Sequence, residues 1–184
     1  EFWKGVVTDG GAVTWGDGTT GHTLNGIFEA VSATNSLVGT TASDHAGLHG
    51  IQALTNGNYV VASATWDSPS DVDAGAVTWM NGTTGLTTTG GIGAITTSNS
   101  LHGTTVNDQA GLGGITALTN GNYVVGSNMW DGPVTDSGAL TLVNGSGANA
   151  GAALADSLFV ISTSNSLYGT TASDQVGVGT SREL

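Results

Sequence analysis

The sequence predicts an all-β repeat protein, a β-propeller-like array of four-stranded antiparallel blades with about 64 residues in each repeat. The first observation is a recurring motif: Asn-Ser-Leu stands at 35–37, 99–101 and 165–167. The second is composition, because 31 glycines and only 2 prolines in 184 residues favour short strands joined by tight turns. The third is the recurrence of whole strand-like segments between these motifs, which indicates a structural unit rather than a short linear motif.

The first two strands of a repeat are predicted to form a hairpin. Residues 51–54 and 59–63 are rich in β-prone side chains and are separated by Asn56-Gly57. Asn-Gly fits the mirror-image turns whose twist matches that of paired strands. The same pattern returns at 115–127 around Asn120-Gly121, so we expect this hairpin in two of the repeats.

The third and fourth strands are predicted at 75–79 and 92–97, on either side of a turn at 81–85. Alternation of apolar and polar residues is typical of strands, and Asn and Gly are typical of turns. The counterparts of the third strand lie at 11–15 and 138–142, and those of the fourth at 28–33 and 158–163.

Four repeat segments follow from the positions of Asn-Ser-Leu. Residues 1–34 are expected to be a partial repeat with the third and fourth strands, and 35–98 and 99–164 are the second and third repeats. Residues 165–184 are expected to start a truncated repeat and to end in an artificial tail. The chain is then one Asn-Gly hairpin short of three repeats, so either a longer array was cut or a neighbouring molecule supplies the hairpin.

Three motifs in this order resemble a known family. Residues 36–47, 59–63 and 73–79 are similar to a degenerate FG-GAP repeat, the blade of integrin-alpha-type propellers. The chain also resembles the repeats of very large bacterial haemagglutinin-like exoproteins. The resemblance implies a propeller, a role in cell adhesion and, in the FG-GAP family, loops of aspartates that bind calcium.

The charge pattern excludes several partners. Lys and Arg total 2 against 14 acidic residues, which gives a net charge of −12, and the two cations are Lys4 and Arg182. Nucleic acids and anionic membranes are bound mainly through Lys and Arg, so neither is expected as a partner. The chain has no cysteine and no apolar run long enough to span a bilayer, so no membrane insertion is expected. These features favour a bacterial protein that is secreted or displayed on the cell surface.

Two sets of aspartates are candidate site residues. Asp67, Asp71 and Asp73 occupy the position of the calcium-binding loop that the resemblance implies, but their spacing differs from that of calcium loops. Turn capping is therefore the favoured interpretation, and a calcium site is the alternative. The second set recurs in every Thr-Thr-x-x-Asp loop and is interpreted as structural, since active sites rarely repeat with the fold: Asp44, Asp108 and Asp174.

The tryptophans leave two interpretations open. Trp3, Trp66 and Trp130 share one repeat position at the exit of the second strand, and Trp15 and Trp79 share another. They either pack between blades or stack on a glycan. The sequence offers no paired glutamates and no recurring nucleophile and base, so we predict no enzymatic activity.

The predicted function is a non-catalytic structural or adhesive repeat segment of a bacterial surface or secreted protein, and the alternative is a lectin-like propeller that uses the first tryptophan position. An open set of blades leaves lateral faces exposed, so a homo-oligomer is expected. A dimer is favoured over a trimer because it supplies about six blades. A glycan or another host-surface ligand is the expected partner outside the assembly.

Overall fold

The computed structural model describes residues 2–179, and all regular elements in that part of the chain are β-strands in three antiparallel sheets. No helix capable of crossing a membrane occurs among the described residues. The first sheet contains β1 (Ala12–Thr14) and β2 (Ser36–Val38). The second contains β3 (Ile51–Ala53), β4 (Tyr59–Ser63), β5 (Ala76–Met80) and β6 (Ser100–His102). The third contains β7 (Gly114–Ala117), β8 (Tyr123–Ser127), β9 (Ala139–Val143) and β10 (Ser166–Tyr168).

The predicted hairpins are confirmed. β3 pairs with β4 so that Ile51 faces Val61, and β7 pairs with β8 in the same way. In the first of these turns the backbone N–H of Leu54 donates to the carbonyl of Asn58 at 2.8 Å, and Gly57 has a φ of 88°. A positive φ costs glycine little, so Gly57 closes the turn that the Asn-Gly pair predicts.

The prediction of the fourth strand is wrong in its position. Residues 92–97 form no strand; the fourth strand is the Asn-Ser-Leu segment itself, β6, which pairs with β5. Residues 92–97 instead cross to the preceding sheet, where the N–H of Val38 donates to the carbonyl of Gly93 at 2.8 Å and the N–H of Ile95 donates to the carbonyl of Val38 at 3.0 Å. The same correction applies to residues 28–33 and 158–163, which also form no strand. A crossing segment that buries Ile95 has the same apolar pattern as a half-buried strand, which explains the error.

Each residue of the Asn-Ser-Leu motif has a separate structural task. The side-chain amide of Asn99 donates to the carbonyl of Ala94 at 3.0 Å, and its oxygen accepts the Thr96 N–H at 2.9 Å. The hydroxyl of Ser100 lies 2.7 Å from that of Thr78 on β5. Leu101 is fully buried against the next sheet. The motif therefore fixes the crossing segment, the strand pairing and the packing of neighbouring sheets together.

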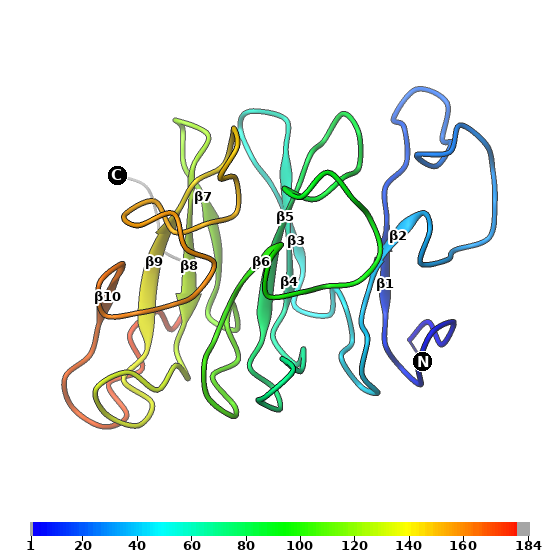
Figure 1. Ribbon diagram of the computed structural model, residues 1–184. Coiled ribbons are helices and arrows are strands. Elements are labelled where there is room, and N and C mark those ends of the chain that lie inside the picture. The colour runs from blue at the N-terminus through cyan, green and yellow to red at the C-terminus, as the bar shows by residue number, and fades with distance from the viewer. Residues whose placement is uncertain (1, 180–184) are drawn as a thin grey trace.

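The sheets stand face to face in an open row, with the first sheet at one end and the third at the other (Figure 1). The described residues form no closed ring. One core cluster joins the first and second sheets through residues such as Val13, Val61 and Met80. Another joins the second and third sheets through residues such as Val77, Trp79 and Val125. Burial between sheets is the main apolar contribution to stability, because each sheet alone is too thin to enclose a core.

The repeat boundaries predicted from Asn-Ser-Leu lie at 35, 99 and 165. They are one of several ways to divide a periodic chain, and nothing in the structure tests them. The sheets follow another division, since the second sheet runs from Ile51 to His102 and the third from Gly114 to Tyr168. The tail predicted at the C-terminus lies largely at 180–184, outside the described residues.

A tyrosine in each four-stranded sheet has a buried hydroxyl group without a hydrogen-bond partner among the described residues. The hydroxyls of Tyr59 and Tyr123 have no hydrogen-bond partner among the described residues. Burial raises the pKa of Tyr123 and raises that of Tyr59 from 10.0 to about 12. Each hydroxyl carries a desolvation cost that no hydrogen bond offsets.

Tyr123→Phe is therefore expected to raise the free energy of unfolding by about 1 kcal/mol. Stability of the unmodified chain should also fall as pH rises from about 10 to about 12, because tyrosines ionise near 10 in the unfolded chain and only near 12 at Tyr59 in the folded one. Urea unfolding at pH 8 and pH 11 measures both effects. A double Tyr59→Phe, Tyr123→Phe variant with undiminished alkaline sensitivity would contradict the assignment to these two groups.

Candidate interaction surface

The chain passes from one sheet to the next through a loop built around a buried aspartate. After β2, Asp44 Oδ2 accepts the N–H groups of Thr40 and Thr41 at 2.6 and 2.8 Å, and Oδ1 accepts the N–H of Asp67 at 3.0 Å. Asp44 is fully buried. The first two bonds close the loop, whereas the third joins it to the exit of β4 in the next sheet.

The second joint repeats this arrangement. Asp108 is fully buried, and its Oδ2 accepts the N–H groups of Thr104 and Thr105 at 2.6 and 2.9 Å. Its Oδ1 accepts the N–H of Asp131 at 2.9 Å, at the exit of β8. We call each aspartate-centred loop an aspartate joint. The recurring aspartate thus supplies a buried acceptor for backbone donors of its own loop and of the next sheet.

The electrostatics of the first joint balance two opposing effects. Burial raises the pKa of Asp44 above its ordinary value, while the N–H groups of Asp67, Thr41 and Thr40 lower it. Burial has the larger effect. The backbone hydrogen bonds therefore offset part of the desolvation cost of the buried carboxylate.

A glycine lets the joint approach the third strand closely. Gly75, directly before β5, has a φ of 72°, and a Cβ there would lie 2.2 Å from the backbone nitrogen of Ala110. Gly11 and Gly138 show the same conflict with Ala46 and Val176. Any side chain at Gly75 would push the joint away from the sheet, so packing requires the glycine that precedes the third strand of each repeat.

The third aspartate joint is incomplete. Asp174 Oδ2 accepts the N–H groups of Thr170 and Thr171, both at 2.9 Å, as in the other joints. Its Oδ1 accepts no hydrogen bond from the described residues, and the side chain is exposed. The missing bond is the one that Asp67 and Asp131 make in the preceding joints, in which the donor belongs to the following sheet.

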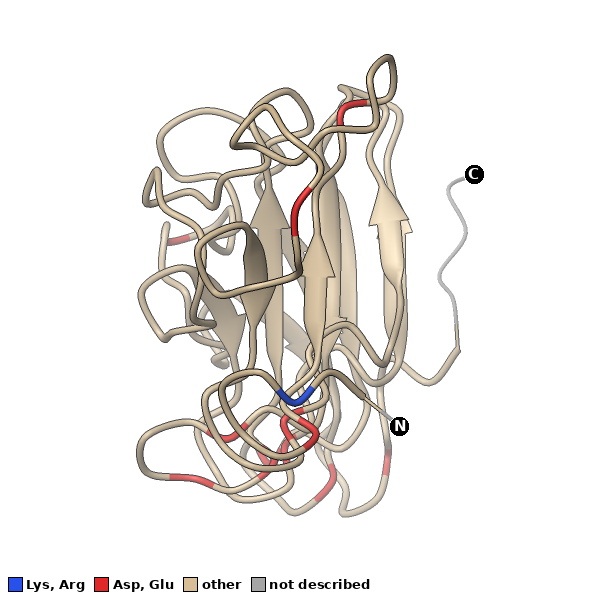
Figure 2. Ribbon diagram, turned by 90° about the vertical axis from the view of Figure 1, so that its right-hand side faces the viewer, with Lys and Arg blue, Asp and Glu red and all other residues tan. Residues whose placement is uncertain are grey.

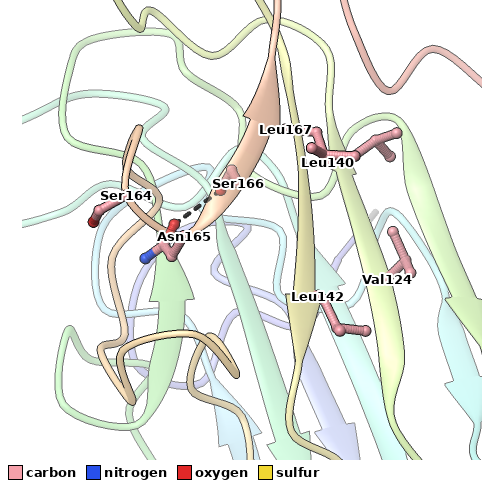
Figure 3. Close-up of a pocket in the computed structure, with 7 residues that line it drawn as sticks. All are labelled: Val124, Leu140, Leu142, Ser164, Asn165, Ser166 and Leu167. Carbon is pink, nitrogen blue, oxygen red and sulfur yellow. Dashed lines mark hydrogen bonds between the residues drawn. The ribbon is translucent and has the colours of Figure 1, made fainter.

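The outer side of the third sheet presents an apolar surface, which we call the C-terminal face (Figure 3). It surrounds a hollow of about 460 Å³ beside the Asn165–Ser166 hydrogen bond of 2.9 Å. Leu167 is 74% exposed, whereas its counterparts Leu37 and Leu101 are 0% exposed. The side chains that form the face are Val124, Leu140, Leu142 and Leu167.

The same positions of the second sheet are buried by the third sheet. Val60, Val77, Trp79 and Leu101 correspond to the four residues of the C-terminal face, and all four belong to the core cluster between these sheets. Trp79 also donates from Nε1 to the carbonyl of Gly145 at 3.0 Å. The C-terminal face is therefore the exposed copy of a surface that the chain covers elsewhere.

A family model described as a repeat of unknown function, DUF5650, matches residues 1–48, 53–112 and 117–178. The chain belongs to this family. No curated protein and no solved structure matches it. The match supports the repeat predicted from the sequence, and it leaves the FG-GAP resemblance unconfirmed.

The tryptophans of the DUF5650 repeat lie in or beside the core. Trp66 and Trp130 are 1% and 3% exposed, and Trp3 is half-buried. Trp66 belongs to the cluster between the first two sheets and Trp130 to the cluster between the second and third. Stacking on a glycan requires an exposed ring face, and Trp66 and Trp130 present none in this structure.

The aspartates predicted as an alternative calcium site do not gather around a common point. Asp67 Oδ1 accepts the N–H of Asp73 at 2.8 Å, and Asp71 Oδ2 accepts the hydroxyl of Ser70 at 2.6 Å. No three His, Asp or Glu side chains among residues 2–179 come together in a way that could hold a metal ion. Asp67 and Asp71 instead bond within the β4–β5 loop, as expected for turn caps.

Many of the acidic residues lie in loops at one end of the sheets, at the bottom of Figure 2. The aspartate joints and the β4–β5 and β8–β9 loops belong to this end. Lys4 lies there as well, and its ammonium is 3.7 Å from the Asp9 carboxylate. The end is therefore strongly negative, with one positive group on the side of the first sheet.

Sequence reasoning placed the recurring aspartates in loops, where they were expected to bind loop amides, but it missed the bonds that Asp44 and Asp108 accept from Asp67 and Asp131 of the next sheet. It also missed the C-terminal face as a set of residues. The sequence did contain one signal, since Leu101 and Leu167 occupy the same position of Asn-Ser-Leu. Comparing the two repeats could have shown that Leu167 belongs to the same apolar surface as Leu101.

Proposed function

We propose that this chain is a non-catalytic structural and adhesive repeat segment of a bacterial surface or secreted protein. The observation that carries the proposal is the aspartate joint, which is built twice with the same bonds to Asp67 and Asp131. The joint connects sheets, and both carboxylate oxygens of Asp44 and Asp108 accept backbone hydrogen bonds there. A chain that repeats such joints gains length and rigidity with each added sheet.

The location outside the cytoplasm is supported by composition. Residues 5–181 contain no Lys or Arg and the chain has no cysteine, so trypsin-like proteases find no cleavage site in that stretch and folding needs no disulfide. The loops at the acidic end supply a surface for contact with a host or a neighbouring cell. In this proposal the four-stranded sheets are propeller-type blades related to FG-GAP repeats, and further blades would be needed to complete a ring.

The proposal is tested with antibodies raised against the purified chain, applied to cells that produce the parent protein. We expect labelling of intact cells or of protein in the culture medium, and loss of surface attachment when the coding segment is deleted in frame. Labelling that requires permeabilised cells would contradict a surface or secreted location. Unchanged attachment after deletion would contradict the adhesive role.

A further inference from the structure

The two ends of the row carry complementary halves of the interface that joins the sheets. Inside the chain this interface has three parts: apolar contact between sheets, pairing of an edge strand with a crossing segment, and the aspartate joint. The third sheet presents an apolar face, the edge of β10 and Asp174. The first sheet presents counterparts of the groups that cover these three features elsewhere in the chain. The two sheets lie at opposite ends of the molecule (Figure 1), so they cannot meet within one chain.

We infer that the C-terminal face binds the first sheet of a second copy of this chain, in head-to-tail order. This goes beyond the structural role proposed above, because it names the partner and the contact. Continuity with the two internal interfaces and the charges at the two ends support this contact.

Among the described residues, the edge of β10 lacks the kind of crossing segment that covers the corresponding edges of β2 and β6. On β6 the N–H of His102 donates to the carbonyl of Phe159 at 3.0 Å, and the carbonyl of His102 accepts the N–H of Ile161 at 3.1 Å. Tyr168 is the counterpart of His102 and Val38, and no described residue pairs with its edge in this way. An exposed strand edge of this kind is a template for pairing with another chain.

The first sheet carries the counterpart of a crossing segment, and no edge strand among residues 2–179 pairs with it. Residues 28–31 align with 92–95, which pair with β2. Phe28 is 75% exposed and Val31 is 40% exposed, whereas Ile95 and Ile161, the counterparts of Val31, are each 1% exposed. The apolar side chains that would cover Leu140 and Leu167 are thus already displayed on the opposite end.

The aspartate joints supply the charge complementarity. Asp44 and Asp108 each accept their third backbone hydrogen bond from the next sheet, from the N–H of Asp67 and of Asp131 respectively. In the first repeat, Lys4 occupies the position of Asp67 and Asp131. Docking would bring the backbone of Lys4 and its positive side chain to Asp174. A cation at this one position favours contact with an exposed carboxylate, and no other described residue of the chain is a Lys or Arg.

The size of the contact limits its strength. The first sheet has two strands against four in the others, so a second copy covers the half of the C-terminal face formed by β9 and β10. The contact is heterologous, since different surfaces meet, and it either closes into a ring or continues as an open row. We therefore expect weak association that increases with protein concentration.

The test uses sedimentation velocity on the full chain and three variants that each add one lysine. Leu167→Lys places a charge on the C-terminal face, and Val31→Lys places one on the first sheet. Val72→Lys, at a residue that is 56% exposed in the β4–β5 loop, is the matched control. Circular dichroism and thermal unfolding verify that the variants fold, as their exposed positions predict.

We expect oligomers for the unmodified chain and for Val72→Lys, and at least about tenfold weaker association for Leu167→Lys and Val31→Lys alone, because each contact would bury a lysine. An equal mixture of Leu167→Lys and Val31→Lys should form a one-to-one dimer, since each variant keeps the face that the other has lost. An unmodified chain that stays monomeric at its highest soluble concentration would overturn the inference. So would a Val31→Lys variant that associates normally, because it would indicate pairing of two C-terminal faces. Neither result would affect surface labelling of cells, which tests the proposed function separately.

Discussion

Asp108→Ala is expected to lower the free energy of unfolding by about 3–5 kcal/mol, because it removes a fully buried carboxylate that accepts three backbone N–H groups. The donors are Thr104, Thr105 and Asp131, and the first two lie in the joint itself. Losing the Asp131 bond also weakens the connection between the second and third sheets. Urea unfolding followed by tryptophan fluorescence measures the change.

Asp174→Ala is the matched control, since it removes the same side chain from the same loop motif. Asp174 is exposed and bonds only to Thr170 and Thr171 among the described residues, so water can replace the lost acceptor. We expect a loss below about 1 kcal/mol. Equal losses for Asp108→Ala and Asp174→Ala would show that the bond between sheets contributes nothing.

Leu101→Ala is expected to cost about 2–5 kcal/mol, because it opens a cavity in the core between the second and third sheets. Leu101 is 0% exposed and packs in the cluster that contains Val77, Tyr123 and Val125. The loss should appear as a lower urea midpoint with unchanged far-ultraviolet circular dichroism of the folded state.

The same substitution at Leu167 is expected to change stability by less than about 0.5 kcal/mol in dilute protein. Leu167 occupies the same position of Asn-Ser-Leu but is 74% exposed. The difference between Leu101→Ala and Leu167→Ala therefore measures how much a neighbouring sheet contributes to the free energy of unfolding at this motif position. A large loss at Leu167 in dilute protein would mean that something covers the C-terminal face within a single chain.

The sequence was sufficient to predict an all-β repeat fold and its hairpins, whereas the propeller stays a prediction. Asn56-Gly57 and Asn120-Gly121 specify local turns, and local turn chemistry needs no information from distant residues. The recurrence of Asp44 and Asp108 with a fixed loop motif led to the further prediction that they are structural. The hairpin turns depend on a few neighbouring residues, which explains why they could be predicted.

The fourth strand could not be placed in the same way. Residues 92–97 and 100–102 both carry strand-compatible patterns, and only pairing decides between them. Thr78 on β5 pairs with Ser100, while Ile95 is carried to the preceding sheet. Pairing between strands depends on contacts across the whole repeat, so a periodic apolar pattern alone cannot select the segment that joins the sheet.

By itself the sequence determined that the chain is an acidic all-β repeat protein, because composition, periodicity and turn residues are properties of the chain alone. Only the tertiary structure decided which copies of a repeated residue are satisfied. Asp108 and Asp174, or Leu101 and Leu167, have the same local motifs but differ in burial. The physical reason is that burial and hydrogen-bond satisfaction depend on whether a further sheet stands against the residue, and a repeat motif does not encode its own neighbour.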